Sequence, residues 1–165
     1  MVPLQFLALW AAKHAFLLEQ KMKSKFLHIG MTVKSIEKTA EFYSKYLGFE
    51  MQNSFTFPAE FFQKKKELYK LTDGTFAPAA FLKSPDGIVL ELFEFNPQLP
   101  FENPVWNRPG YHHLCFKLEN MPDRAKEMKA DGVEFYFDPD FRGPPEGGEY
   151  WVFLKDPDGN MIELQ

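Results

Sequence analysis

Apolar and polar residues alternate in two short segments that each begin with a histidine. The segments are HIGMTV at 28–33 and HLCFKL at 113–118. A period of two is typical of a strand with one buried face. We therefore expect two strands with their histidines pointing away from the core. The expected core-facing residues are Leu27, Ile29, Met31 and Val33 in the first segment, and Leu114, Phe116 and Leu118 in the second.

A helix is predicted after each of these strands. In the first half Ser35 can cap a run whose apolar positions are spaced by three or four residues, and Gly48 supplies the stop. In the second half Asn120 and Pro122 open a comparable run that Gly132 closes. The two helices correspond in place and type.

Further strand-like segments follow each helix. We expect strands at 49–57, 75–82 and 88–95 in the first half, and at 133–137, 150–154 and 161–164 in the second. The insert AEFFQKKKELYKL at 59–71 has the periodicity of a helix and makes the first half longer. Each half thus reads strand, helix, strand, strand, strand, which indicates an internal repeat.

The repeat is clearest where PDGIVLEL at 85–92 matches PDGNMIEL at 157–164. Alternation along these final strands leaves Glu91 and Glu163 on the face opposite their aliphatic neighbours. A carboxylate in an aliphatic strand is costly unless it is paired, hydrogen-bonded or coordinated. Taken singly, each of these glutamates is more often a charge at a sheet edge, and His28 or His113 is more often a hydrogen-bonded core residue or a surface residue. Together, two imidazoles and two carboxylates related by a repeat favour a divalent metal site.

The chain is long enough for one domain made of two halves, with 165 residues of which 45% are apolar. We predict an N-terminal extension at 1–24, module one at 25–96, a proline-rich linker at 97–110 and module two at 111–165. The apolar run in the extension is shorter than a membrane span, so we expect a helix or an upstream segment there, with a secretion signal as the alternative.

Charge and cysteine content exclude other classes. With a net charge of −4, the chain lacks the positive electrostatic potential that attracts nucleic acid. The single cysteine, Cys115, permits no intrachain disulfide, and we expect it to be a small core residue. We therefore expect the protein to be cytoplasmic.

The chain from residue 25 onward resembles the vicinal oxygen chelate superfamily (glyoxalase, bleomycin resistance protein and dioxygenase family), and within it the glyoxalase I-like proteins most closely. The resemblance is carried by HIGMTV, AEFYSKYLGFE, PDGIVLEL, GYHHLCFKL and DPDGNMIEL. It implies an α+β fold in which two βαβββ modules curl their mixed sheets into a metal-binding cup. The implied metal ligands are His28, Glu91, His113 and Glu163. His112 is one residue before His113, so it points to the opposite face of the strand and is expected to be structural.

The resemblance also implies a chemistry. Two histidines and two glutamates match bacterial-type glyoxalase I, and disfavour the iron site of ring-cleaving dioxygenases, which has two histidines and one carboxylate. We expect nickel, cobalt, zinc or manganese, with Glu163 as the first choice of base and Glu91 as its partner. The implied function is a lactoylglutathione lyase-like reaction through an enediolate. The alternatives are a methylmalonyl-CoA epimerase-like enzyme and a non-catalytic binding or resistance protein.

Substrate and assembly are predicted more coarsely. The expected partner is a small molecule, such as a thiol adduct or thioester, and by resemblance the chain forms a homodimer. The metal site then lies either within one chain or across two. Arg142, in the glycine-rich segment DFRGPPEGGEYW at 140–151, is a candidate for holding an anionic group of the substrate, and a solvated arginine on a loop is the alternative.

Overall fold

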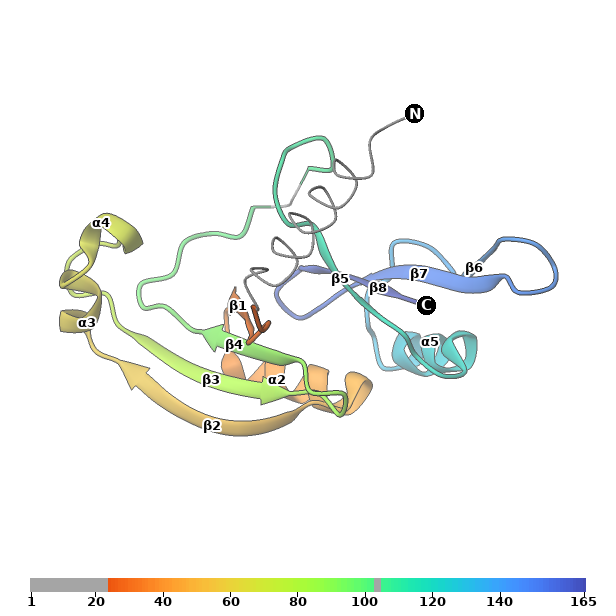
Figure 1. The fold of residues 1–165 in the computed structure, drawn as a ribbon, viewed down its shortest axis with the longest axis horizontal. Helices are drawn as coiled ribbons and strands as arrows, with labels where there is room; N and C mark the ends of the chain where they lie inside the picture. The colour runs from red at the N-terminus through yellow and green to blue at the C-terminus, as the bar shows by residue number, and fades with distance from the viewer. Residues whose placement is uncertain (1–23, 103–104) are drawn as a thin grey trace, which may run out of the picture.

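A computed structural model of the chain describes residues 24–102 and 105–165. It contains two four-stranded mixed sheets (Figure 1). Only the last residue of the predicted extension at 1–24 is among the described residues, so the helix expected there lies outside them. Among the described residues, no helix is long and apolar enough to cross a membrane.

The first sheet has the strand order β1-β4-β3-β2. Its elements, in chain order, are β1 (Ile29–Thr32), α2 (Ile36–Leu47), β2 (Glu50–Phe57), α3 (Ala59–Gln63), α4 (Lys66–Tyr69), β3 (Ala77–Lys83) and β4 (Val89–Phe93). The first and last strands, β1 and β4, are parallel neighbours, and the other pairs are antiparallel.

The second sheet repeats this plan with the order β5-β8-β7-β6. Its elements are β5 (His113–Phe116), α5 (Met121–Ala130), β6 (Asp140–Arg142), β7 (Glu149–Lys155) and β8 (Met161–Leu164). Here β5 and β8 are the parallel pair. The predicted α+β class with two βαβββ modules is confirmed, and the two sheets do not close on each other within the chain.

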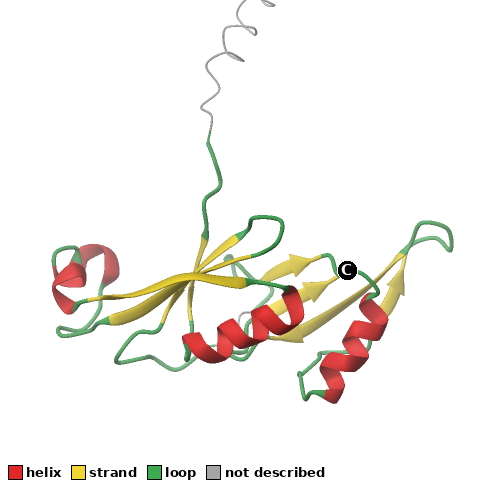
Figure 2. Ribbon diagram, turned by 90° about the horizontal axis from the view of Figure 1, so that it is seen from below, coloured by secondary structure: helices red, strands yellow, loops and turns green. Residues whose placement is uncertain are grey.

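Both long helices lie on the same side of the sheets (Figure 2). Ser35 caps α2 by accepting a hydrogen bond from the backbone N–H of Lys38, and Gly48 ends the helix in the left-handed region at φ 70°. The core between helices and sheets is continuous across both modules and includes Leu90, Leu92, Ile162 and Leu164, none of which is exposed. The opposite face of each sheet is therefore left for the site.

Polar contacts also join the modules. The Thr39 hydroxyl of α2 donates to Asp158 Oδ2 at 2.8 Å, and the Tyr43 hydroxyl donates to Asp156 Oδ2 at 3.4 Å. Both aspartates belong to the turn that leads into β8, and both are buried. Burial beside Asp156 raises the pKa of Tyr43 well above its usual value, so this phenol remains a donor.

Three predictions about elements are wrong in detail. The insert at 59–71 forms two short helices, α3 and α4, because the chain breaks helical geometry at Lys65, where φ is −133°. The predicted strand at 133–137 makes only an isolated bridge between Phe135 and Leu154; its alternating pattern reflects side chains packed on the core. The fourth strand of module two is instead β6. Leu27, predicted to face the core, is 65% exposed because it precedes β1.

Candidate metal centre

Module one brings His28 and Glu91 together on its open face. His28 immediately precedes β1, and Glu91 lies in the middle of the adjacent parallel strand β4, opposite Gly30. The Nε2 atom of His28 is 3.1 Å from Glu91 Oε2. The histidine side chain is 43% exposed and the glutamate side chain 14% exposed. Both groups are thus accessible from the open face, as strand parity predicted.

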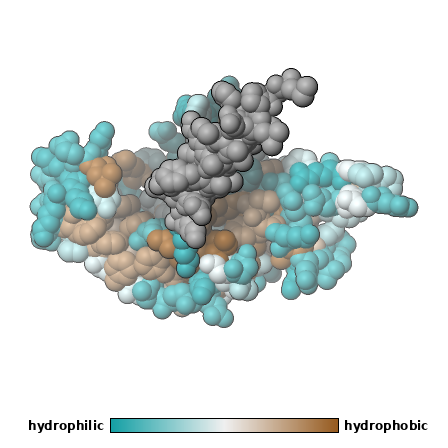
Figure 3. Space-filling model, viewed as in Figure 1, coloured by the Kyte–Doolittle hydropathy of each residue, from teal (hydrophilic) through white to brown (hydrophobic). Residues whose placement is uncertain are grey.

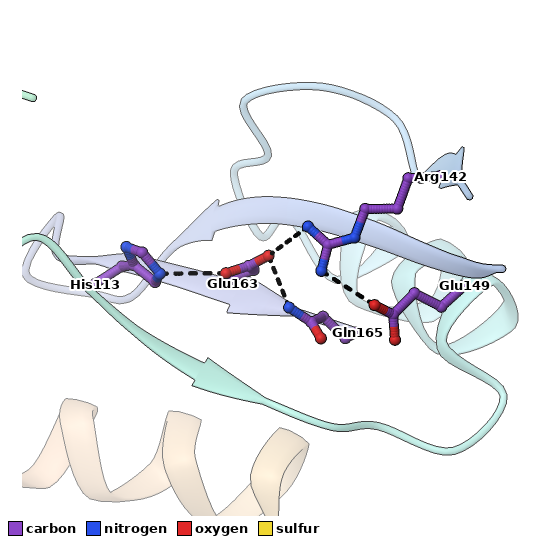
Figure 4. A network of polar contacts seen from close by, with 5 residues as sticks. All are labelled: His113, Arg142, Glu149, Glu163 and Gln165. Atoms are coloured by element: carbon purple, nitrogen blue, oxygen red, sulfur yellow. Dashed lines mark hydrogen bonds and ion pairs between the residues drawn. The ribbon is translucent and has the colours of Figure 1, made fainter. Parts of the chain in front are cut away.

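Module two repeats the arrangement with His113 and Glu163 (Figure 4). His113 opens β5 and Glu163 lies on the adjacent parallel strand β8. Their Nε2 and Oε2 atoms are 3.2 Å apart. The side-chain amide of Gln165 donates to the second oxygen of Glu163, Oε1, at 2.9 Å. One carboxylate oxygen therefore faces the histidine and the other is held from the far side.

Arg142 also reaches Glu163, which its position in a glycine-rich segment did not indicate. It lies at the end of β6, where its cross-strand partner is Glu149. Its guanidinium crosses over the ring of Trp151, with 5.4 Å between the guanidinium carbon and the ring centroid. The Nη1 atom is 3.5 Å from Glu163 Oε1, and Nη2 is 3.2 Å from Glu149 Oε1 (Figure 4). The pairing of β6 with β7 therefore holds the arginine next to the His113–Glu163 pair.

The expectation that Cys115 is a small core residue is wrong. Cys115 is exposed and stands opposite Glu163 in the parallel register, on the same face as His113. Partial burial, followed by the charge of Glu163 and a hydrogen bond to it, raises the pKa of the thiol to about 11. The thiol is therefore protonated near neutral pH and is not an activated nucleophile.

His112 lies apart from the histidine–glutamate pairs. Its ring stacks on Trp106 at a centroid distance of 5.2 Å, and its Nε2 is 3.3 Å from the carbonyl oxygen of Val105. These contacts tie the end of the linker to the start of β5. The structural role expected for His112 agrees with these contacts.

The structure does not gather the four candidate ligands into one cluster. Within residues 24–102 and 105–165, no group of three or more histidine, cysteine, aspartate or glutamate residues is placed to hold a metal ion. His28 and His113 both line a cavity of about 490 Å³ between β1 and β5, which the glutamates do not line. The open faces lie beside each other on the side opposite the helices (Figure 2). Each module thus presents half of a four-ligand set.

The donor chemistry of each half suits a divalent ion. Imidazole nitrogen with carboxylate oxygen, and no thiolate, is a set used by nickel, cobalt, zinc and manganese. Each pair has its two donor atoms 3.1 to 3.2 Å apart, on an accessible face. The Gln165 amide that holds the far oxygen of Glu163 is the kind of outer contact that orients a metal-binding carboxylate.

Sequence reasoning missed two neighbours of Glu163. Gln165 follows it by two residues and Cys115 follows His113 by two, so strand parity already put both on the site face. The sequence did not predict the register of β5 with β8, which places Cys115 directly opposite Glu163. Strand parity was thus a usable signal for both residues.

The paired modules and their matched half-sites define the class to which the chain belongs, that of proteins built from two βαβββ units. More particularly, the family described as the Glyoxalase/Bleomycin resistance protein/Dioxygenase superfamily matches residues 25–164, so the chain belongs to that superfamily.

Individual relatives are more distant. The chain is 28% identical over 144 residues to a 2-epi-5-epi-valiolone epimerase from Actinomyces sp, covering 83% of this chain and 76% of the relative. It is also 28% identical over 153 residues to a lactoylglutathione lyase from Pseudomonas putida, covering 84% and 83%. A solved glyoxalase family protein from Bacillus cereus has the same fold, with a TM-score of 0.71 at 18% identity over 88% of this chain and 95% of that one.

Proposed function

We propose that the protein is a metal-dependent lyase or isomerase that acts on a small carbonyl compound through an enediolate, with chemistry like that of lactoylglutathione lyase. The observation that carries the proposal is the repeated histidine–glutamate pair, 3.1 Å apart in module one and 3.2 Å apart in module two. Both pairs lie on open faces of equivalent strands, as metal ligands would. The similarity to a lactoylglutathione lyase supports the same reaction class.

In this proposal His28, Glu91, His113 and Glu163 hold one divalent ion, nickel, cobalt, zinc or manganese. When bound, such an ion chelates the oxygens of the substrate and stabilises the negative charge of the enediolate. Glu163 takes the proton from the carbon acid and passes it to Glu91, which returns it to the substrate. Gln165, which donates to Glu163 Oε1, keeps that carboxylate oriented.

We further propose that the four ligands meet between two copies of the chain. Within one chain the open faces of the two sheets point the same way (Figure 2), and Glu91 and Glu163 do not line the cavity that His28 and His113 share. A two-fold axis would place module one of one copy opposite module two of the other, and would create two equivalent sites. This proposed two-chain site supports the homodimer that is expected from the resemblance.

An epimerase is the second candidate, and the similarity to a 2-epi-5-epi-valiolone epimerase favours it. Both reactions begin by removing a proton next to an oxygen-bearing carbon, and they differ in where that proton returns. The same ligands and the same base serve both. A non-catalytic binder, by contrast, has no need for four metal-binding side chains.

The proposal is tested by metal analysis of the purified protein, followed by parallel assays. The substrates are the hemithioacetal of methylglyoxal and glutathione, and methylmalonyl-CoA, with solvent deuterium exchange recorded for each. We expect about one bound divalent ion per chain, because a dimer with two four-ligand sites has one site for each chain. We also expect exchange of the substrate proton at carbon. Exchange without net product identifies the epimerase. Protein that neither contains nor binds a divalent metal would refute the proposal.

A further inference from the structure

Arg142 is a cationic side chain that contacts Glu163 on the open face of module two. Among the described residues it is the one cationic side chain in polar contact with a candidate ligand, apart from the histidines themselves. It is 43% exposed, and it reaches Glu163 from two strands away by lying over Trp151. The stacked ring and the β6-β7 pairing position the guanidinium before any substrate binds.

The present contacts of Arg142 are long. Its nitrogens lie 3.5 Å from Glu163 and 3.2 Å from Glu149, whereas a charge-assisted bond to a carboxylate has a length of about 2.7 to 2.9 Å. A metal ion held by Glu163 would draw that carboxylate's charge away from the arginine. The guanidinium would then present free N–H groups beside the ion, in the planar geometry that fits a carboxylate.

The open face of module one has a different character. Aromatic rings cover it around Glu91: Phe81 is the direct cross-strand neighbour of Glu91, and Phe55 lies 5.9 Å from Phe81 between ring centroids. Phe57 and Phe93 stack at 5.8 Å and continue the surface along the sheet. Figure 3 shows hydrophobic residues gathered over this module, on the face opposite α2.

These rings remain accessible. Phe55 is 39% exposed, and Phe57, Phe81 and Phe93 are half-buried. On the same face of β3 as Phe81, Ala77 and Ala79 are fully buried. These small residues and the rings around them form an apolar surface beside His28 and Glu91, and Asn53 and Thr32 lie at its edges, opposite Phe81 and Phe93.

We infer that the substrate carries a carboxylate, which Arg142 binds beside the metal, and an apolar group of about the size of a phenyl ring, which the Phe55, Phe57, Phe81 and Phe93 surface binds. The inference rests on the proposed function, because the two faces oppose each other only in the proposed two-chain site. It narrows the substrate to apolar α-hydroxy or α-oxo acids. Glutathione adducts, with two carboxylates and an ammonium group, suit one arginine and an aromatic floor less well.

Binding is tested with three simple probes on the full chain, loaded with whichever of nickel, cobalt, zinc or manganese it binds. Mandelate has both groups, lactate lacks the ring, and 1-phenyl-1,2-ethanediol lacks the charge. Calorimetry gives the affinities. We expect mandelate to bind about tenfold or more tightly than either of the other probes.

Variants assign each part of the effect. Arg142→Gln should weaken mandelate about tenfold while leaving the diol unchanged. Phe81→Leu, which keeps the face apolar and the fold intact, should weaken both ring-bearing probes and spare lactate. Lactate binding as tightly as mandelate, or an equal effect of Arg142→Gln on mandelate and diol, would overturn the inference. So would tighter binding of S-methylglutathione than of mandelate.

Metal content separates this inference from the proposed function. Arg142→Gln removes no candidate ligand and should retain the metal of the unmodified protein. If the protein binds metal but shows no preference for mandelate, the inference fails and the proposed function stands. If no metal binds at all, the proposed function itself fails.

Discussion

Glu163 is the residue on which the proposed chemistry depends most. Its side chain is 10% exposed, yet it contacts a histidine, an arginine and a glutamine amide. A buried carboxylate with partners on both oxygens is stable in the absence of metal, which explains how a charge persists between Ile162 and Leu164. The same contacts aim one oxygen toward His113.

Glu163→Gln should therefore abolish turnover while the protein stays folded. The amide keeps the shape and most hydrogen bonds but cannot accept the substrate proton, so we expect kcat to fall about 10²- to 10⁴-fold. Activity assays with circular dichroism as a folding check measure this. Glu134→Gln, an exposed glutamate paired with Lys155 away from the half-sites, is the control. Full activity in Glu163→Gln would exclude it as the base.

At this scale the sequence predicted which side chains share a face, because strand parity depends on local geometry alone. It thus placed His28 with Glu91 and His113 with Glu163. It could not predict that Arg142 reaches Glu163, because that contact depends on a long side chain crossing the intervening strand β7.

Among the elements, the turn into β8 and helix α2 depend on each other. Asp158 accepts hydrogen bonds from the backbone N–H of Lys34 at 2.6 Å and from the Thr39 hydroxyl at 2.8 Å. Thr39 is fully buried and Asp158 nearly so. The contact joins module one to module two through polar groups of which Thr39 and Asp158 are buried.

Thr39→Val should destabilise the protein by about 1 to 3 kcal/mol, because it keeps the volume of the side chain but leaves Asp158 short of a buried donor. Urea unfolding measures the change in the free energy of unfolding. Thr39→Ser, which keeps the hydroxyl and removes only a methyl group, should lose clearly less. Equal losses in the two variants would show that packing, and not the hydrogen bond, accounts for the effect.

Asp156, in the same turn, gives stability a pH dependence. Burial raises its pKa above the ordinary value of 3.8, against the opposing effect of hydrogen bonds from Asn160. Between these two pKa values the folded chain binds more protons than the unfolded chain. The contribution of Asp156 to stability therefore falls as the pH rises from 3.8 through the raised pKa.

Asp156→Asn does not titrate, so the stability advantage of the unmodified protein over this variant should be largest in acid and shrink as the pH rises. Urea unfolding from about pH 3.5 to about pH 6.5 measures it. The exposed Asp138→Asn serves as control. An advantage that grows with pH would contradict the assignment.

Local signals predicted most of the elements. Ser35 and Gly48 mark the ends of α2, and the repeated PDG turns precede β4 and β8. The strand expected at 133–137 failed because its alternating side chains pack on the core while only two backbone hydrogen bonds, Tyr136 to Phe153 and Lys155 to Glu134, reach β7. Periodicity reports burial, and burial without a full ladder does not make a strand.

At the scale of the whole molecule, the sequence predicted four ligands but not where they meet. That outcome depends on how the modules pack, which is decided by long-range contacts such as those of α2 with the turn before β8. The resulting chain has both open faces on one side, with an aromatic surface on one and an arginine on the other. A second copy turned by a two-fold axis would cover each face with its complement.

Mixing two inactive variants tests this arrangement. The double variant His28→Ala with Glu91→Ala lacks the half-site of module one, and His113→Ala with Glu163→Ala lacks that of module two. Each alone should bind no metal tightly. In a cross-chain dimer, a mixed pair has one site with all four ligands intact and one with none, so unfolding and refolding an equal mixture should restore about a quarter of the metal sites. A site within one chain would recover nothing, because no chain in the mixture has all four ligands.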